Sequence, residues 1–285
     1  MNLGTICKER LGSIPLWQWE SIEQVRKLLS DEESKSTYDE EILYLAEQEI
    51  KHNGKAGFSS PLSEKEYDRA VRKAWKMLGT GTLPKLHCSG RGSVYFYAST
   101  FVLEQYRYGD IVKFEPNEKL YDCGACIGIV SVACALNGGN AVAFEPVPTT
   151  FVDLAQNAGM YCTIVPVCCG VGDNNEQRYI CTKGSADSAT LLKLGDTLIV
   201  VRRIDDLVEE YGVPTFIKMD LEGFEIEALK GAEQTIRQHK PKMAVCLYHK
   251  RSDMWEIPIL LNTWVPEYRF YCKKSGTDFV LFATL

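Results

Sequence analysis

The pattern of hydrophobic and polar positions changes in character near residue 119. Upstream, apolar residues recur at helical spacing, whereas downstream short apolar runs alternate with amphipathic stretches. Five apolar runs predict strands at Leu120–Cys123, Ala141–Phe144, Cys162–Val167, Thr215–Met219 and Met243–Leu247. Helices are predicted at Ile127–Leu136, Thr149–Ala158, Ile204–Glu210 and Phe224–His239, and a polar, hairpin-like stretch at Gln177–Leu192 precedes a short strand at Leu198–Val201.

Strands that alternate with helices of this length predict an α/β fold. Right-handed βαβ units then build a doubly wound, mostly parallel sheet. Near the C-terminus, Tyr268–Cys272 and Asp278–Phe282 flank a short polar segment, Lys273–Thr277, which predicts a terminal hairpin. This hairpin would give a Rossmann-like, seven-stranded sheet an antiparallel edge.

The first third of the chain has a helical pattern. Helices are predicted at Ile22–Leu29, at Asp31–His52, and from Ser63 to Leu78. Gly79–Gly92 is rich in glycine and is expected to be a linker or flap, and Val94–Ala98 is expected to be a short strand. We therefore divide the chain into an N-terminal helical appendage with a flap, residues 1–93, and an α/β domain, residues 94–285.

Composition excludes several classes of partner. Hydrophobic residues make up 45% of the 285 residues, enough for a substantial core, and the net charge of −6 argues against nucleic-acid binding, which needs a basic surface. No apolar run approaches the roughly 20 residues that span a bilayer, and residues 1–10 lack the core of a signal peptide. We expect a cytoplasmic protein without membrane contact, whose eleven cysteines are reduced.

The stretch Tyr121–Ser131 is the first candidate for ligand binding. Asp122 ends an apolar run, Gly124 and Gly128 bracket a turn, and a helical pattern follows. A strand, a glycine turn and the start of a helix bring backbone N–H groups to one point, which suits a polar or anionic group of a ligand. The structural alternative is an ordinary tight turn.

Glu145 narrows the ligand to a nucleoside. It follows Gly128 by 17 residues, about where an acidic residue accepts hydrogen bonds from ribose hydroxyls. The two glycines are spaced as Gly-x-x-x-Gly rather than G-x-G-x-x-G, which disfavours a pyrophosphate. S-adenosylmethionine, a nucleoside without a diphosphate, is therefore the leading candidate for the cofactor.

Four short motifs carry further information. They are Asp-x-Gly-Ala-x-x-Gly at residues 122–128, Phe-Glu-Pro at 144–146, Asp-Asp-Leu at 205–207 and, most specific, Ile-Lys-Met-Asp-Leu-Glu-Gly-Phe-Glu at 217–225. Together they resemble the FkbM-type methyltransferases, a branch of the class I S-adenosylmethionine-dependent enzymes. The resemblance covers roughly residues 119–285, and it departs at Cys126 and Ile127, where polar or aromatic turn residues are more usual.

The resemblance implies which residues hold the cofactor. Asp122, Gly124 and Gly128 would shape the pocket around its methionine part, and Glu145 would hold its ribose. Backbone groups after the third strand, near Cys169, would contact adenine. The full set of expected cofactor-binding residues is Asp122, Cys123, Gly124, Ala125, Cys126, Gly128, Glu145, Pro146, Cys169 and Asp220.

Methyl transfer to a hydroxyl group needs a residue that takes the proton of the acceptor. His249, after the fifth strand, is the expected base, because an unperturbed imidazole titrates near neutrality. Asp220, after the fourth strand, would orient the cofactor amino group or the acceptor hydroxyl, with Glu222 and Lys218 nearby. The alternatives are a strand-end histidine bonded to a loop carbonyl and acidic residues placed in the first turn of a helix.

Two other features carry weaker hypotheses. Cys123 and Cys126 have the spacing of a redox pair, which is an alternative to a role as pocket walls. No second C-x-x-C pair exists to complete a zinc site, and we expect no metal. The hydroxyl-rich stretch Thr182–Thr190 would bind a polyhydroxyl acceptor or solvate a hairpin.

We therefore expect an S-adenosylmethionine-dependent O-methyltransferase. Its acceptor would be a hydroxyl group of a small molecule such as a sugar, a surface-polysaccharide precursor or another secondary metabolite, a class that comes from the resemblance. Two alternatives stay open: a non-catalytic module that binds S-adenosylmethionine or a nucleotide, and a dinucleotide-dependent oxidoreductase on the same sheet topology. The oligomeric state has no signal in the sequence.

Overall fold

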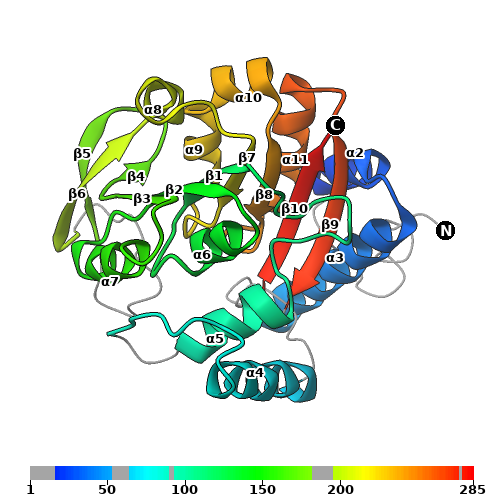
Figure 1. Ribbon diagram of the computed structural model, residues 1–285. Coiled ribbons are helices and arrows are strands. Elements are labelled where there is room, and N and C mark those ends of the chain that lie inside the picture. The colour runs from blue at the N-terminus through cyan, green and yellow to red at the C-terminus, as the bar shows by residue number, and fades with distance from the viewer. Residues whose placement is uncertain (1–16, 53–63, 90–92, 182–194, 276–277) are drawn as a thin grey trace.

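A seven-stranded sheet forms the centre of the protein (Figure 1). The computed structural model describes residues 17–52, 64–89, 93–181, 195–275 and 278–285. The strands lie in the order β3-β2-β1-β7-β8-β10-β9. In that order their bounds are Ile164–Val167, Asn140–Phe144, Lys119–Cys123, Phe216–Met219, Lys242–Cys246, Asp278–Thr284 and Arg269–Ser275.

The strand order reverses between β1 and β7. β1 pairs in parallel with both β2 and β7, so the chain moves outward from β1 to one edge of the sheet and then returns to the other side of β1. In such a sheet, a crevice opens beyond the carboxyl ends of the two strands at the reversal. The parallel strands and the antiparallel pair β9 and β10 confirm the predicted doubly wound α/β fold with its C-terminal hairpin.

Helices cover both faces of the sheet, and each face has its own hydrophobic core. On β1, Leu120 belongs to one core and Tyr121 and Cys123 to the other, and all three are fully buried. Burial on both faces explains why the central strands read as continuous apolar runs. Helices α6 (Ile129–Leu136) and α7 (Pro148–Ala158) cover the Leu120 face. The other face carries α8 (Ile204–Tyr211), α9 (Glu225–Lys230), α10 (Glu233–His239) and α11 (Asp253–Trp264).

The N-terminal helices divide between these two cores. α2 (Trp17–Leu28) packs against α11, and α3 (Glu32–His52) packs against β9. α4 (Glu64–Gly79), α5 (Ser93–Tyr97) and the π-helix η1 (Ala98–Val102) lie on the opposite face, with α6. The predicted domain boundary between residues 93 and 94 stays a prediction. Within the described ranges, no helix combines the length and the low polarity needed to cross a bilayer.

Three helical segments differ from the prediction. Val94–Ala98, predicted as a strand, belongs to α5 and η1, because Val94, Tyr97 and Ala98 are buried at helical spacing. A five-residue apolar run does not distinguish the two structures by itself. The predicted helix Phe224–His239 is two helices, α9 and α10, and α11 was not predicted.

The break between α9 and α10 has its physical cause at Gly231. The carbonyl oxygen of Gly231 accepts a hydrogen bond from the backbone N–H of Asp205 at 2.9 Å, and the Asp205 carboxylate accepts one from the backbone N–H of Thr235 at 2.8 Å. The carboxylate thus caps the start of α10 from another helix. A Cβ atom on Gly231 would lie 1.8 Å from the backbone oxygen of Gly172, so only glycine permits this packing.

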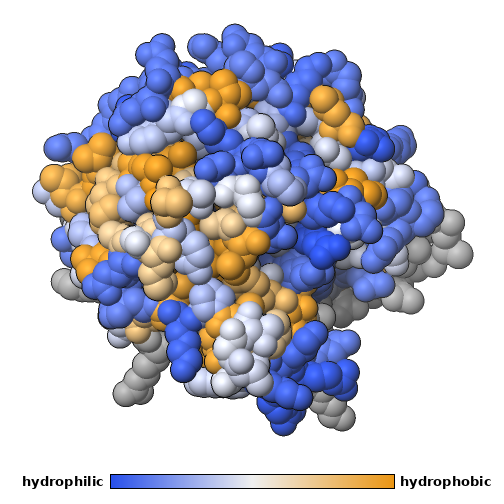
Figure 2. Space-filling view, viewed as in Figure 1, coloured by the Kyte–Doolittle hydropathy of each residue, from blue (hydrophilic) through white to orange (hydrophobic). Residues whose placement is uncertain are grey.

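A smaller sheet, in the order β4-β6-β5, lies beside β3 (Figure 1). Its strands are β4 (Gly170–Val171), β6 (Thr197–Arg202) and β5 (Glu176–Ile180). Ile199 and Val201 are buried, whereas Leu198 and Val200 are about half exposed, and Figure 2 shows hydrophobic surface at this side of the molecule. The stretch Thr182–Thr190 lies outside the described residues.

Replacing Gly231 with alanine should destabilise the protein. The new methyl group meets the backbone of Gly172, which cannot rotate away, so we expect Gly231→Ala to lower the free energy of unfolding by about 1–3 kcal/mol. Urea denaturation followed by circular dichroism measures the change. The matched control is Gly79→Ala, because a Cβ at Gly79 has no neighbour within 4 Å among the described residues. Equal stabilities of the two variants would contradict the packing argument.

Candidate functional site

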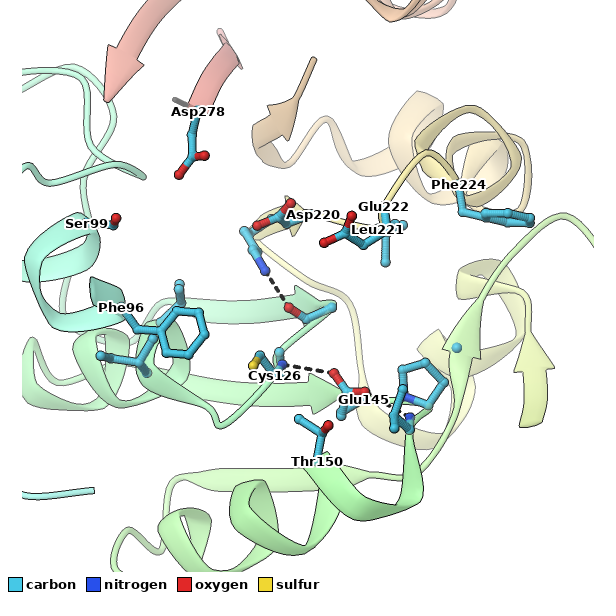
Figure 3. A pocket seen from close by; sticks show the side chains of 18 of the residues that line it. Phe96, Ser99, Cys126, Glu145, Thr150, Asp220, Leu221, Glu222, Phe224 and Asp278 are labelled. Carbon is cyan, nitrogen blue, oxygen red and sulfur yellow. Dashed lines mark hydrogen bonds between the residues drawn. The ribbon is translucent and has the colours of Figure 1, made fainter. Parts of the chain in front are cut away.

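A pocket of about 340 Å³ opens at the carboxyl ends of β1 and β7 (Figure 3). Its volume suits a small molecule. The loops after β1, β2 and β7 form one part of the wall, and α5, η1 and the small sheet contribute further parts. The residues that line the pocket include Tyr95, Phe96, Ser99, Thr100, Tyr106, Gly124, Ala125, Cys126, Glu145, Pro146, Val171, Ile199, Lys218, Asp220, Glu222, Tyr248 and Asp278.

A buried ion pair joins β1 to β7 beneath the pocket. Asp122 and Lys218 are direct register partners, and the Nζ atom of Lys218 lies 3.2 Å from Oδ1 of Asp122. The same Nζ donates to the backbone oxygen of Gly124 at 2.7 Å, while Oδ2 of Asp122 accepts hydrogen bonds from the backbone and side chain of Ser131. Both charged side chains are almost completely buried, so each depends on the other for compensation.

The loops after β1 and β7 touch each other so closely that glycine is required. A Cβ atom on Gly124, which has a φ of +76°, would lie 2.0 Å from the backbone oxygen of Asp220. The backbone is also strained on both loops, since Cys126 and Glu222 have φ values of +50° and +53°. Non-glycine residues in this region are uncommon and cluster at functional sites. The two loops therefore form one rigid floor for the pocket.

Glu145, at the end of β2, is buried in the pocket wall (Figure 3). Its carboxylate accepts hydrogen bonds from the backbone N–H groups of Val147 at 2.8 Å and Cys126 at 3.0 Å. Burial nevertheless raises its pKa to about 7, because these bonds compensate only part of the lost hydration. A ligand that donates hydroxyl groups to this carboxylate would favour its ionised form.

Asp220 lies across the pocket from Glu145 (Figure 3). The hydroxyl of Tyr248 donates to Oδ1 at 2.8 Å, and the hydroxyl of Tyr106 donates to Oδ2 at 2.9 Å. Burial alone would raise the pKa of Asp220. The charges of Lys218 and His249, together with the two tyrosine hydrogen bonds, instead hold the pKa below its usual value. Asp220 is therefore an ionised carboxylate at neutral pH.

His249 lies behind Asp220 and does not line the pocket. Its Nδ1 atom is 2.8 Å from Oε1 of Glu225, and its Nε2 atom is 3.5 Å from Oδ1 of Asp220 and 3.6 Å from Oε2 of Glu222. Burial would lower its pKa, but the hydrogen bond and charge of Glu225, with the charges of Asp220 and Glu222, raise it to about 9. The sequence argument for His249 as a base assumed a pKa near neutrality, and this environment removes that premise.

The predicted site residues fall into two groups. Eight line the pocket: Gly124, Ala125, Cys126, Glu145, Pro146, Lys218, Asp220 and Glu222. Asp122, Cys123, Gly128 and Cys169 are buried and do not line it, and His249, whose side chain is 7% exposed, does not line it either. Asp122 thus supports the loop after β1 rather than facing the pocket. Of the two C-x-x-C cysteines only Cys126 lines the pocket, and neither of the two forms a disulfide bond.

The sequence did not predict most of the pocket wall that lies opposite the loops after β1, β2 and β7. Tyr95, Phe96, Ser99 and Thr100 come from α5 and η1, a segment predicted as a strand next to a flap. Tyr106 comes from a loop with no motif. Tyr248 had a signal, because it follows a predicted strand at the carboxyl edge of the sheet.

The pocket is acidic. Glu145, Asp220, Glu222 and Asp278 supply carboxylates, and among the described lining residues Lys218 is the one basic side chain. Since Lys218 already pairs with Asp122, the surplus charge facing the pocket is negative. This charge favours a ligand that carries a positive group.

Comparisons with known proteins give a family for this arrangement. Residues 122–270, more than half of the chain, match the family described as the methyltransferase FkbM domain. The chain is 31% identical over 131 residues to the hexuronic acid methyltransferase AglP of Haloferax volcanii, an alignment that covers 43% of this chain and 53% of AglP.

A solved structure is also similar. The crystal structure of methyltransferase FkbM from Methylobacillus flagellatus aligns with a TM-score of 0.61 and 25% sequence identity. This alignment covers 93% of the present chain and 58% of that protein. The chain therefore spans little more than half the length of either relative.

Removing the cation of the buried pair should destabilise the fold. Lys218→Met leaves Asp122 charged and uncompensated, so we expect the free energy of unfolding to fall by about 3–5 kcal/mol. The matched control is Lys113→Met, since Lys113 pairs with Asp110 at the exposed surface, where the loss is about 1 kcal/mol or less. Chemical denaturation measures both. Similar losses of unfolding free energy in the two variants would show that the buried pair does not stabilise the junction of β1 and β7.

Proposed function

Because the chain belongs to the FkbM methyltransferase family, we propose that it transfers a methyl group from S-adenosylmethionine to a hydroxyl group of a sugar or a related small molecule. The acceptor would be a surface-polysaccharide precursor or another secondary metabolite. The observation that carries the proposal is the placement of Glu145 and Asp220 on opposite walls of one acidic pocket at the strand-order reversal.

The pocket has the groups that S-adenosylmethionine needs. The carboxylate of Glu145 would accept hydrogen bonds from the ribose hydroxyls, and the apolar side chains of Val171 and Ile199 offer a wall for the adenine ring. The negative charge of Asp220 suits the cationic methionine end. When bound, the cofactor supplies a methyl group on a positively charged sulfur.

Asp220 is the group best placed to receive the proton of the acceptor. Each of its carboxylate oxygens accepts one tyrosine hydroxyl, from Tyr248 or Tyr106, and keeps a second lone pair that an acceptor hydroxyl could use. The two tyrosines also fix the direction of the carboxylate. His249 would act on the reaction through Asp220, because it does not line the pocket.

A sugar acceptor is supported by the other end of the pocket. Tyr95 and Phe96 present aromatic rings there, and Ser99 and Thr100 add small hydroxyl groups. Aromatic rings beside polar groups suit a ligand with one apolar face and many hydroxyls. The similarity to AglP, described as a hexuronic acid methyltransferase, agrees with this class of acceptor.

Cofactor binding should depend on pH through Glu145. The carboxyl is partly protonated in the free protein near pH 7, while ribose hydroxyls bind its ionised form. We expect the dissociation constant for S-adenosylmethionine to be about tenfold larger at pH 6 than at pH 8. Isothermal titration calorimetry measures it. Glu145→Gln should bind at least tenfold more weakly at pH 8 and lose this pH dependence. The same pH dependence in the variant would exclude Glu145 as its source.

Replacing Asp220 should abolish turnover without abolishing cofactor binding. With labelled S-adenosylmethionine and a panel of uronic acids, sugar nucleotides and other polyhydroxyl compounds, we expect methyl transfer by the wild-type chain. Asp220→Asn should lower kcat by about a hundredfold or more, because the amide cannot take a proton. The control is Asp110→Asn, an exposed carboxylate that does not line the pocket. Absence of S-adenosylmethionine binding by the wild-type chain would contradict the proposed function.

A further inference from the structure

The cluster behind Asp220 contains an imidazole nitrogen without a hydrogen-bond partner. The side chain of His249 is only 7% exposed. A carboxylate can only accept, so the 2.8 Å contact between Nδ1 and Oε1 of Glu225 places a hydrogen on Nδ1. Among the described residues, no atom forms a hydrogen bond with the buried Nε2. Nε2 instead faces carboxylate oxygens of Asp220 and Glu222 at 3.5 Å and 3.6 Å.

These distances fit ligands around a metal ion better than they fit hydrogen bonds. Two ligand atoms that each lie 2.0–2.2 Å from an ion are about 3.0 Å apart in octahedral coordination and about 3.4 Å apart in tetrahedral coordination. A second buried atom, Oε2 of Glu225, also has no hydrogen-bond partner within the described part of the chain. In addition, Asp220, Glu225 and His249 each present a potential ligand atom, and these atoms lie within 4.8 Å of one another.

Glu225 holds the imidazole in the way that metal sites require. Its Oε1 atom contacts Nδ1 of His249 and accepts a hydrogen bond from the backbone N–H of Leu221 at 2.7 Å. A carboxylate bonded to one ring nitrogen fixes the orientation of the ring and directs the other nitrogen toward a metal. Glu225 itself is fully buried, so its place is set by the fold.

We propose that this cluster binds one divalent cation through Nε2 of His249 and a carboxylate oxygen of Asp220, with Glu225 orienting the imidazole and the carboxylate of Glu222 beside the ion. Nitrogen and oxygen ligands together suit a first-row ion such as Mn²⁺. Binding displaces any proton on Nε2. It also compensates the negative charge of three carboxylates gathered around one imidazole.

The cation would connect the buried cluster to the pocket. Asp220 and Glu222 line the pocket (Figure 3), whereas His249 and Glu225 are not among its lining residues. An ion held there would bind the hydroxyl oxygen of the acceptor and make its proton more acidic, and that proton would pass to Oδ2 of Asp220, which has a second lone pair beside its bond from Tyr106. This role rests on the proposed function, but binding of the ion does not. Sequence reasoning expected no metal because every ligand set that it weighed contained cysteine.

Titration of metal-free protein with Mn²⁺ tests the site. The electron paramagnetic resonance signal of free Mn²⁺ disappears on binding, and we expect one ion per chain. His249→Ala should weaken binding at least tenfold, and Glu225→Gln by about 10–100-fold, the usual effect of losing a carboxylate behind a ligand. The matched control is His239→Ala, which removes an exposed imidazole at the end of α10 and should bind Mn²⁺ as the wild type does. Thermal unfolding of each metal-free variant checks that it is folded.

A measurement on the wild type alone keeps the test decisive if the variants do not fold. Crystals soaked in Mn²⁺ should show an anomalous diffraction peak between His249 and Asp220. No binding by the wild type, equal binding by His249→Ala, or a peak elsewhere would overturn the proposal and leave His249 as the cation of an ion-pair cluster. S-adenosylmethionine binding is measured separately. Mn²⁺ binding without S-adenosylmethionine binding supports the metal site and contradicts the proposed function. S-adenosylmethionine binding without Mn²⁺ binding contradicts the metal site and leaves the proposed function standing.

Discussion

The buried pair of Asp122 and Lys218 is the constraint on which the rest of the site depends. Two charges taken out of water require each other, and here they lie opposite one another on the two strands between which the strand order reverses. Lys218 also holds the backbone of Gly124, and Gly124 touches the backbone of Asp220. One ion pair therefore fixes the relative position of both loops that form the floor of the pocket.

The two carboxylates that face each other across the pocket have pKa values shifted in opposite directions. Glu145 has only backbone N–H partners, so its pKa rises to about 7. Asp220 lies beside Lys218 and His249 and accepts two tyrosine hydroxyls, so its pKa falls. A protein can thus place one carboxyl that responds to a ligand opposite one that stays ionised, and the neighbours rather than the residue types make the difference.

The helices that precede β1 contribute to the pocket on both sides of the predicted domain boundary between residues 93 and 94. α5 and η1 supply aromatic and hydroxyl side chains to the wall, and α4 packs against η1. These helices form one side of the pocket beside the sheet. α5 and η1 are helical because Val94, Tyr97 and Ala98 are buried at helical spacing. The sequence did not predict these helices, because a short apolar run fits a strand as well as a helix.

The sequence by itself determined the fold class, the order of the central strands and helices, and the loops that form the pocket, because period, glycine spacing and strand ends are local properties. Glu145, Asp220 and Glu222 could be found in this way. Only the tertiary structure decided what surrounds each side chain. It placed Asp122 beneath the loop, broke a helix at Gly231, and enclosed His249 among three carboxylates, since burial and electrostatic environment arise from residues far apart in the chain.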